Sequence, residues 1–209
     1  GAEVTGVDLT PAQLALARDR ALVEGVDVTF REGDAQDLQL PDASFDAVVS
    51  VKGMIFAPAH RAAVQELVRV ARPGGHVAVT AWSAHDSWFA AWRAHAGDLM
   101  PPPAADGAGP RPDEWGDPAT LARRLAEGGL GDVTVEVEPF EWTFGSVEEG
   151  MEYFLTTSGP FIAFMDALGA QGRAEEGRAV LADALRQENR AGDGSLLLSA
   201  PYLLGFGRR

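Results

Sequence analysis

Short apolar runs alternate with amphipathic stretches along the first 82 residues. The apolar runs are bounded by Gly, Asp, Pro and Ser, which is typical of strands in a buried sheet. The strands are expected at residues 3–9, 26–34, 44–51 and 76–82.

Two helices are expected between these strands. Residues 10–25 begin with Thr10 as N-cap and Pro11 in the first turn, and residues 60–75 end at the Pro-Gly-Gly run 73–75. The apolar residues at helical spacing are Leu14, Ala17, Ala21 and Leu22 in the first, and Val64, Leu67, Val68 and Ala71 in the second. Strands that alternate with helices favour a parallel sheet of βαβ units.

The chain after Trp82 is less regular. A Pro/Gly-rich loop at residues 101–118 is long enough to suggest a functional lid. The other expected elements are helices at 86–100 and 118–130, one alternating strand at 132–144, two or three helices within 146–191, and a strand at 195–209 broken by Pro201.

The chain is acidic, with 31 acidic against 17 basic residues and a net charge of −14. This charge disfavours binding to nucleic acid or to an anionic membrane, and no apolar run approaches the roughly 18 residues of a membrane span. The absence of cysteine excludes disulfides and thiolate metal sites and fits a reducing cytoplasm. We expect a cytoplasmic protein whose partner is a small molecule. No spacing of His, Asp and Glu suggests a metal, and the oligomeric state is left open.

Two carboxylates follow consecutive predicted strands. Ligands of open parallel sheets bind outside the carboxyl ends of the strands, where Asp8 and Asp34 are expected. An acid in the first position can accept hydrogen bonds from both ribose hydroxyls, and an acid one strand further out can accept from the adenine amino group. Either residue alone could be a helix cap or a turn residue. The pair, in this order, favours a nucleoside ligand.

Three stretches resemble, in order, the motifs of the class I S-adenosylmethionine-dependent methyltransferases. They are VTGVDLTPAQLALAR (4–18), VTFREGDAQDLQLPDASFDAVVS (28–50) and LVRVARPGGHVAVTAW (67–82). The branch they resemble most is that of the small-molecule C-methyltransferases of ubiquinone and menaquinone biosynthesis. The resemblance covers residues 3–82, and the final YLLGFGRR resembles the last strand of the same fold, whereas residues 83–192 match loosely.

The resemblance implies an α/β fold with a Rossmann-like sheet, mainly parallel with an antiparallel last strand, and S-adenosyl-L-methionine as cofactor. It places Asp8 at the ribose diol and Asp34 near the adenine amino group. Leu9 would lie beside the adenine, and Val51 and Lys52 at the methionine end. The full set implied for the cofactor is Asp8, Leu9, Asp34, Ala35, Val51 and Lys52.

One family feature has no counterpart here, namely the first strand and its Gly-rich loop, which should precede Asp8. In the family strand order 3-2-1-4-5-7-6 the missing strand is central. Without it, the strands at 3–7 and 46–51 would lie two inter-strand spacings apart, roughly 10 Å, each with an unpaired edge. We therefore expect the native protein to begin some tens of residues earlier, and these residues to complete at most half of a cofactor site.

Methyl transfer from a sulfonium needs a general base only if the acceptor must lose a proton. His85 is the first candidate because it follows the fourth expected strand, although a histidine in that position is more often a solvated loop residue; His60, His95 and Tyr153 are lesser candidates. The residues expected to line an apolar acceptor pocket are Met54, Phe56, Trp82, Trp88, Tyr153 and Phe161. Aromatic residues at helical spacing are also typical of a core.

The predicted function is methyl transfer from S-adenosylmethionine to a small, partly apolar molecule. A nicotinamide-dependent oxidoreductase stays open because Asp8 would hold a ribose equally well, and a non-catalytic binding module stays open because Lys52 would repel a sulfonium. The expected organisation is a cofactor-binding half (1–82), an acceptor-side helix and loop (83–117), a core helix and strand (118–145), a helical insertion (146–192) and a final core strand (193–209).

Overall fold

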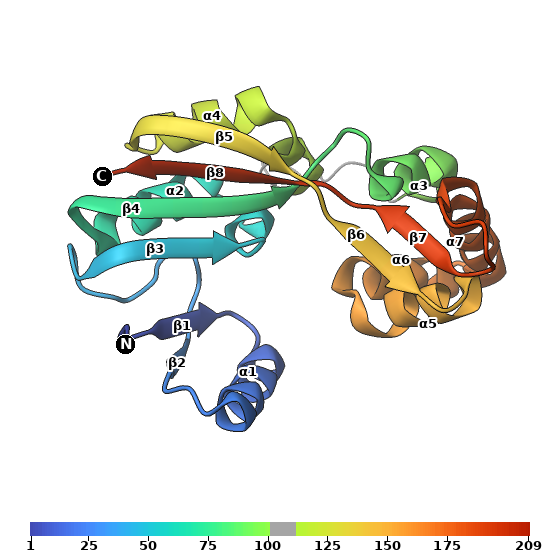
Figure 1. The fold of residues 1–209 in the computed structure, drawn as a ribbon, viewed down its shortest axis with the longest axis horizontal. Coiled ribbons are helices and arrows are strands. Elements are labelled where there is room, and N and C mark those ends of the chain that lie inside the picture. The colour runs from blue at the N-terminus through green and yellow to red at the C-terminus, as the bar shows by residue number, and fades with distance from the viewer. Residues whose placement is uncertain (101–111) are drawn as a thin grey trace. The chain divides into compact units, whose positions relative to one another are not determined.

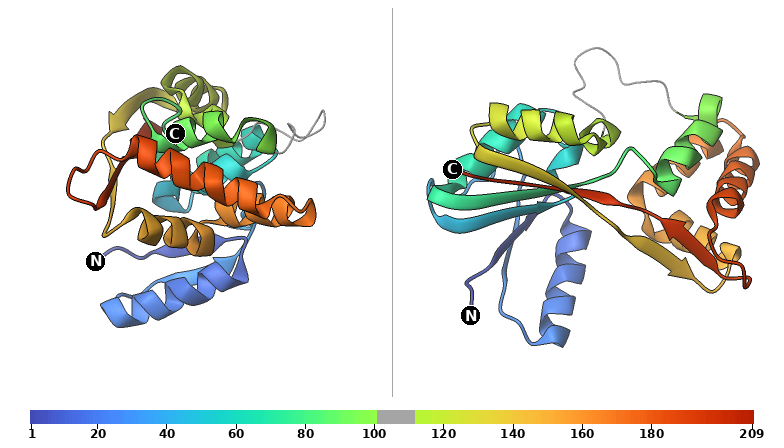
Figure 2. Two further views of the ribbon diagram at one scale, coloured as in Figure 1. Left: turned by 90° about the vertical axis from the view of Figure 1, so that its right-hand side faces the viewer. Right: turned by 45° about the horizontal axis from the view of Figure 1, so that its top comes forward.

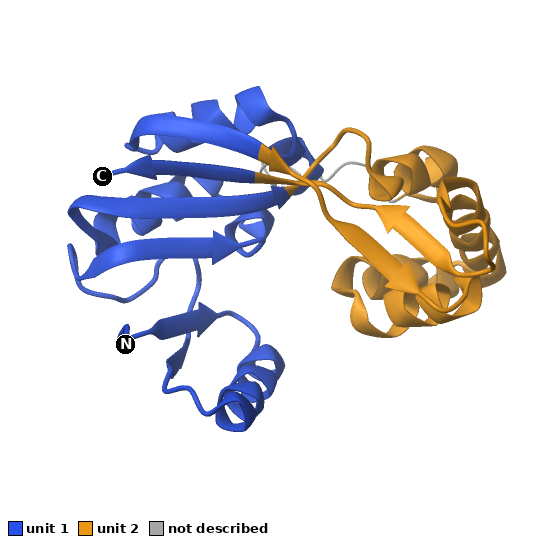
Figure 3. Cartoon of the chain, viewed as in Figure 1, with its two compact units in different colours: residues 1–81, 109–136, 204–209 blue, residues 82–108, 137–203 orange. Residues whose placement is uncertain are grey.

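The computed structural model describes residues 1–100 and 112–209 and divides the chain into two compact units (Figure 3). Unit 1 comprises residues 1–81, 109–136 and 204–209, and unit 2 comprises residues 82–108 and 137–203. In the described part of the chain, no helix combines the length and apolar character that crossing a membrane requires.

The N-terminal part of unit 1 is a βαβ segment, in which β1 (Thr5–Asp8) and β2 (Thr29–Glu32) pair in parallel on either side of α1 (Pro11–Glu24) in the sequence. Of the apolar residues at helical spacing in α1, Leu14 is buried, whereas Leu22 is 82% exposed. Two strands of 4 residues each offer too little surface to cover the second half of a 14-residue helix.

Four further strands form a second sheet in the order β3-β4-β8-β5 (Figure 1). Their bounds are Phe45–Val51 for β3, Ala71–Trp82 for β4, Tyr202–Arg208 for β8 and Gly131–Glu138 for β5. β3 and β4 are parallel, and the arrow of β8 runs opposite to those of its neighbours. This confirms the expected mixed sheet with an antiparallel last strand.

The two sheets have the strand order that the family resemblance implies on either side of the position of the family's first strand. The pair β2-β1 corresponds to positions 3-2 of the family order, and β3-β4-β8-β5 corresponds to 4-5-7-6. Among the described residues, β1 and β3 share no hydrogen-bonded pairing, as the lack of a central strand predicts.

The remaining helices of unit 1 are η1 (Met54–Phe56), α2 (His60–Val70), η3 (Pro112–Gly116) and α4 (Pro118–Glu127). The α2 helix ends at Val70 rather than at the expected Pro-Gly-Gly run. Pro73 has no N–H to donate to the Arg69 carbonyl oxygen, and the Arg209 guanidinium donates instead to the carbonyl oxygens of Arg69 (2.6 Å) and Ala71 (2.5 Å). Residues 71–75 therefore begin β4 instead of extending the helix.

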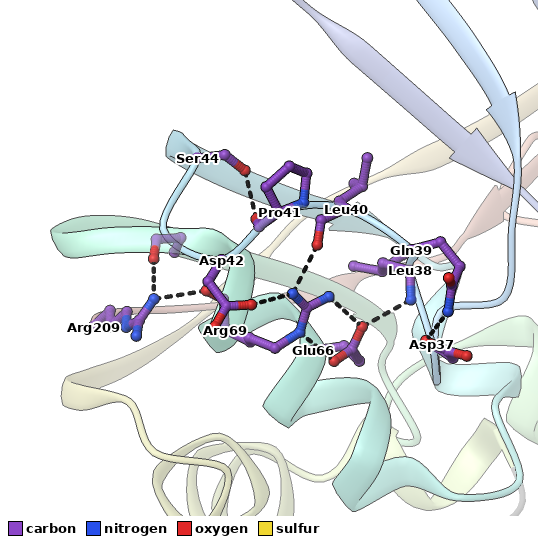
Figure 4. Close-up of polar contacts among 11 residues, drawn as sticks. Asp37, Leu38, Gln39, Leu40, Pro41, Asp42, Ser44, Glu66, Arg69 and Arg209 are labelled. Carbon is purple, nitrogen blue, oxygen red and sulfur yellow. Dashed lines mark hydrogen bonds and ion pairs between the residues drawn. The ribbon is translucent and has the colours of Figure 1, made fainter.

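The connection between β2 and β3 is anchored to α2 by one ion-pair network (Figure 4). Arg69 Nε and Nη2 donate to the two carboxylate oxygens of Glu66 at 2.6 and 2.8 Å. Arg69 Nη1 reaches the Leu40 carbonyl oxygen at 2.7 Å and Asp42 at 2.5 Å. Glu66 in turn accepts from the Leu38 backbone N–H at 2.8 Å. A bidentate arginine fork of this kind fixes the loop in direction as well as in position.

Unit 2 is a two-stranded antiparallel sheet with α-helices, of which α5 and α7 pack on the strands (Figures 1 and 2). The strands are β6 (Glu141–Phe144) and β7 (Leu196–Ser199), and the helices are α3 (Trp88–Ala96), η2 (Gly97–Leu99), α5 (Val147–Thr157), α6 (Gly159–Ala170) and α7 (Ala174–Glu188). The three helices α5 to α7 and the break at Pro201 agree with expectation.

The single strand expected at 132–144 is two strands, β5 and β6, and that expectation was wrong. Pro139 lies in the break and offers no N–H to a sheet. The carbonyl oxygen of the next residue, Phe140, accepts from Ala200 N–H at 2.8 Å. The prediction of strand was therefore correct before and after Pro139, but the two strands belong to different sheets.

Gly128 tests the packing of α4 on α2. An added Cβ would lie 2.1 Å from Val64 Cγ1, while the φ of Gly128 is an ordinary −77°. We expect Gly128→Ala to lower the free energy of unfolding by about 1–3 kcal/mol through overpacking, measured by urea denaturation. Gly169→Ala is the matched control, because no atom lies within 4 Å of its added Cβ. Equal effects of the two substitutions would contradict this contact, and Val64→Ala should partly rescue Gly128→Ala.

Glu66 predicts a pH dependence of stability. The hydrogen bonds from Arg69 hold the pKa of Glu66 below its usual 4.5, so its stabilisation is present above that value and is lost as pH falls through the lowered pKa. We expect Glu66→Gln to destabilise the protein by about 1–3 kcal/mol at neutral pH, and by less as the pH approaches about 3. Urea titrations across this range measure the difference, which would be independent of pH if the charge of Glu66 were irrelevant.

Candidate functional site

The strand pairing brings Asp8 and Asp34 to the same edge of the β1-β2 sheet. Asp8 ends β1 opposite Glu32, and Asp34 lies two residues beyond Glu32. Between them, Gly33 N–H donates to the Asp8 carbonyl oxygen at 3.1 Å. A Cβ on Gly33 would lie only 2.8 Å from Val7 Cγ1, so a glycine here allows the two strand ends to approach closely.

Asp8 is exposed, and one of its carboxylate oxygens, Oδ1, accepts from the Thr10 backbone N–H at 2.8 Å. Thr10 is the N-cap of α1, as expected, but its own side chain makes no capping hydrogen bond. The Asp8 contact is an Asx turn that leads into the helix, because it accepts from the N–H of the N-cap residue itself. Within residues 1–100 and 112–209 the other oxygen, Oδ2, has no hydrogen-bond partner, so Asp8 keeps acceptor capacity at the sheet edge.

Asp34 is half-buried, and Gln36 holds its carboxylate. Gln36 N–H donates to Asp34 Oδ1 at 2.8 Å, and Gln36 Nε2 donates to Oδ1 at 3.1 Å and to Oδ2 at 2.9 Å. Gln36 Oε1 accepts from Ala59 N–H at 2.8 Å. Sequence reasoning did not identify Gln36. The only available signal was an amide side chain two residues after a strand-end aspartate.

The apolar cofactor candidates differ in exposure. Leu9 is 65% and Val51 68% exposed, whereas Ala35 is half-buried beside Asp34. Exposed apolar side chains directly after a strand are surfaces that a ligand can cover. Their contact with a cofactor stays a prediction.

Lys52 is the only lysine of the chain. It follows β3 with a φ of +54°, in the left-handed region that a non-glycine residue adopts at a cost, and its N–H donates to Thr80 Oγ1 at 3.1 Å. Nearby, Met54 N–H donates to Ser50 Oγ at 3.0 Å, which fixes the chain after the turn. The side chain is half-buried, and this burial lowers the pKa of its ammonium group.

The candidate bases have distinct surroundings. His85 is exposed in unit 2, where its N–H and carbonyl oxygen both contact Ser83 Oγ.

The His60 ring lies edge-on to Trp115, and burial together with Arg124 lowers its pKa. His95 joins α3 to α7 through the Ala91 carbonyl oxygen and Gln187 Oε1, both at 2.7 Å, and these hydrogen bonds raise its pKa. Two acceptors on one ring favour the imidazolium and a structural role for His95.

The six acceptor candidates fall in both units. Met54 and Phe56 belong to unit 1, the first buried and the second 53% exposed. The other four belong to unit 2, where Trp88 and Phe161 are stacked in the core at 5.6 Å between ring centroids, with an interplanar angle of 6°. Tyr153 is 37% exposed and Trp82 half-buried. The core position of Trp88 and Phe161 explains their burial without a ligand, and a shared acceptor pocket stays a prediction.

The described residues contain no group of three or more His, Cys, Asp or Glu side chains that could hold a metal ion.

Comparison with known proteins identifies the N-terminal portion of the chain. Residues 1–79 match the model of a methyltransferase domain. An uncharacterised protein of Mycobacterium tuberculosis is 36% identical over 166 residues, which is 78% of this chain and 58% of the relative. The chain thus spans little more than half the length of that relative. The demethylmenaquinone methyltransferase of Thermus thermophilus is 44% identical over 79 residues, which is 38% of this chain and 36% of that protein.

Solved structures match over nearly the whole chain. A putative methyltransferase from Bacillus halodurans aligns with a TM-score of 0.60 at 19% identity, covering 99% of this chain and 83% of its own. A phosphoethanolamine N-methyltransferase of Haemonchus contortus aligns with a TM-score of 0.52 at 18% identity, covering 99% of this chain and 43% of its own. These comparisons give no support to the oxidoreductase alternative. Residues 1–79 therefore belong to the methyltransferase domain family, and the chain has the fold of the class I S-adenosylmethionine-dependent methyltransferases.

Proposed function

We propose that the protein transfers a methyl group from S-adenosyl-L-methionine to a small, partly apolar molecule. The observation that carries this proposal is the pair of carboxylates, Asp8 and Asp34, that follow two adjacent parallel strands. Carboxylates accept hydrogen bonds and donate none, and a nucleoside offers donors at its ribose diol and at its adenine amino group.

Two further observations support this ligand. Gly33, whose added Cβ would lie 2.8 Å from Val7 Cγ1, allows the ends of the two strands that carry the carboxylates to approach closely. The phosphoethanolamine N-methyltransferase of Haemonchus contortus, which shares the fold, was solved in complex with S-adenosyl-L-methionine. The ligand for this chain is inferred from its own acceptors together with that fold.

The bound cofactor supplies an electrophilic methyl carbon on a sulfonium for in-line displacement by a nucleophilic atom of the acceptor. The chain's contribution is to bind and orient. Asp8 accepts from the ribose hydroxyls, Asp34 accepts from the adenine amino group, and Leu9 covers the base. Positioning of this kind replaces a bimolecular encounter by a fixed geometry. Where the acceptor must lose a proton, His85 is the proposed base.

The acceptor is proposed to be a small molecule because the chain has a net charge of −14, which opposes binding to nucleic acid. Its partly apolar character is inferred from the apolar side chains that follow β3 in unit 1, of which Phe56 is 53% exposed. A non-catalytic binding module would keep the nucleoside contacts and lack turnover. Formation of S-adenosylhomocysteine in the presence of a small-molecule panel distinguishes the two.

Asp8→Ala should weaken S-adenosylhomocysteine binding by about 2–4 kcal/mol, because two charge-assisted hydrogen bonds are lost. Isothermal titration calorimetry measures the loss. Asp27→Ala is the matched control, since Asp27 is an exposed acid that precedes β2 rather than following β1. Asp8→Asn keeps an acceptor for Thr10 N–H and so separates the turn from the ligand contact. An unchanged dissociation constant in Asp8→Ala would remove Asp8 from the site.

The charge of Lys52 leads us to expect that the relative affinity for S-adenosylmethionine and S-adenosylhomocysteine depends on pH. Protonated Lys52 repels the sulfonium of S-adenosylmethionine but not the neutral sulfur of S-adenosylhomocysteine. We therefore expect the affinity for the sulfonium form, relative to the neutral form, to rise as pH increases from about 7 to 10 and Lys52 loses its proton. In Lys52→Met the rise should be smaller, because only the ligands' own amino groups titrate there. An equal rise in Lys52→Met and in the wild type would place the Lys52 charge away from the sulfonium.

A further inference from the structure

Gln36 connects the candidate adenine acid to a different element of unit 1. Its side-chain amide lies between the Asp34 carboxylate, which follows β2, and the backbone N–H of Ala59, which is the N-cap of α2. All of the distances lie between 2.8 and 3.1 Å, within the normal range of hydrogen bonds.

The chemistry of these partners fixes the orientation of the amide. A carboxylate only accepts and a backbone N–H only donates, so the Gln36 NH₂ group must face Asp34 and its oxygen must face Ala59. A glutamate would lose the donors and a lysine would lose the acceptor. A side chain of this length that donates at one end and accepts at the other is a glutamine.

The same contacts limit what Asp34 can still accept. A carboxylate has about four acceptor positions, two on each oxygen. Oδ1 receives the Gln36 backbone N–H and one contact from Nε2, while Oδ2 receives only Nε2. One acceptor position therefore remains on Oδ2, and the hydrogen bonds from Gln36 fix its direction.

We propose that Gln36 is a positioning residue that orients the Asp34 carboxylate toward a single N–H donor and thereby sets the preference of the site for adenine over a 6-oxo base. This inference rests on the proposed function, because it assumes that Asp34 faces the base. An adenine amino group donates to the remaining position on Oδ2. A hypoxanthine, which carries an oxygen there, presents an acceptor to an acceptor and is rejected.

The alternative is that Gln36 only braces the loop. The chain offers a matched control for that case, since Gln39 Nε2 donates to Asp37 Oδ1 at 2.5 Å with the same two-residue spacing in the same connection. Both Gln39 and Asp37 are exposed, and neither lies at the strand end. At nearly constant length, methionine in place of Gln36 removes two hydrogen bonds to the Asp34 carboxylate and one to Ala59 N–H, and methionine in place of Gln39 removes one to the Asp37 carboxylate.

The test compares dissociation constants for S-adenosylhomocysteine and S-inosylhomocysteine by calorimetry in wild type, Gln36→Met and Gln39→Met. The wild type should prefer the adenine ligand by about tenfold or more, because the 6-oxo ligand leaves an acceptor unpaired. Gln36→Met should lose most of this preference, and Gln39→Met should retain it. If Gln36→Met weakens both ligands equally or changes neither, Gln36 does not set base preference.

Gln36→Glu adds a second measurement, the pH dependence of the adenine preference, which should not change if Gln36 only stabilises the loop. The carboxylate introduced by this substitution would keep an acceptor for Ala59 N–H but would face Asp34 as a like charge. The two acids should therefore bind a proton at milder acidity than an isolated carboxylate. A protonated carboxyl can donate to a 6-oxo base, and the adenine preference of this variant should fall between about pH 7 and 5. A preference independent of pH in Gln36→Glu would overturn the proposal.

Two outcomes separate this inference from the proposed function. If the wild type binds neither nucleoside, the proposed function fails and Gln36 loses its role with it. If the wild type binds S-adenosylhomocysteine but the glutamine variants keep its base preference, only the inference about Gln36 fails. Thermal unfolding shows whether each variant folds. If Gln36→Met does not fold, Gln36→Glu is used in its place.

Discussion

Parallel pairing of β1 with β2, and of β3 with β4, is the constraint on which the candidate site depends. Parallel neighbours cannot be joined by a tight turn, so α1 and α2 supply the crossovers, and the strands of each pair end at one edge. Residues that follow those ends need not fit under a helix and can be polar. Asp8 and Asp34 follow the first pair, and Lys52 follows β3. The aspartates and the lysine differ in charge, but the parallel pairing of the strands places all three.

The connection after β2 is held by contacts of unequal value. The Arg69 fork on Glu66 and the Gln36 amide are partly buried and each satisfies several groups at once. Such contacts contribute more than exposed pairs like Arg20–Glu24, whose side chains are 81% and 54% exposed and which contribute about 0–1 kcal/mol. Both anchors lead to α2. The orientation of Asp34 therefore depends on a helix that begins only at His60, beyond the next strand of the sequence.

Sequence periodicity predicted the strands and most helices, because these depend on local patterns, and the family resemblance implied the strand order in the sheet. Periodicity failed where a proline or a distant residue decides. Pro139 divides the long strand that was expected at 132–144, and α2 ends where Pro73 has no N–H to donate and Arg209 donates to the helix carbonyl oxygens instead. Gln36 was missed for the same reason, since its partner Ala59 is not visible from spacing alone. Trp88 and Phe161 could not be sorted between core and pocket, because burial depends on tertiary packing.

Long-range and local electrostatics act in opposite directions on a cationic ligand here. The net charge of −14 attracts a sulfonium, but only over roughly one Debye length, about 8 Å at physiological salt. Lys52 opposes it at short range if it stays protonated. A chain with 16 arginines and one lysine places that lysine where burial lowers its pKa. An arginine could not lose its proton there. In the proposed site, a lysine that can lose its proton would avoid the permanent cation that an arginine would place near the sulfonium.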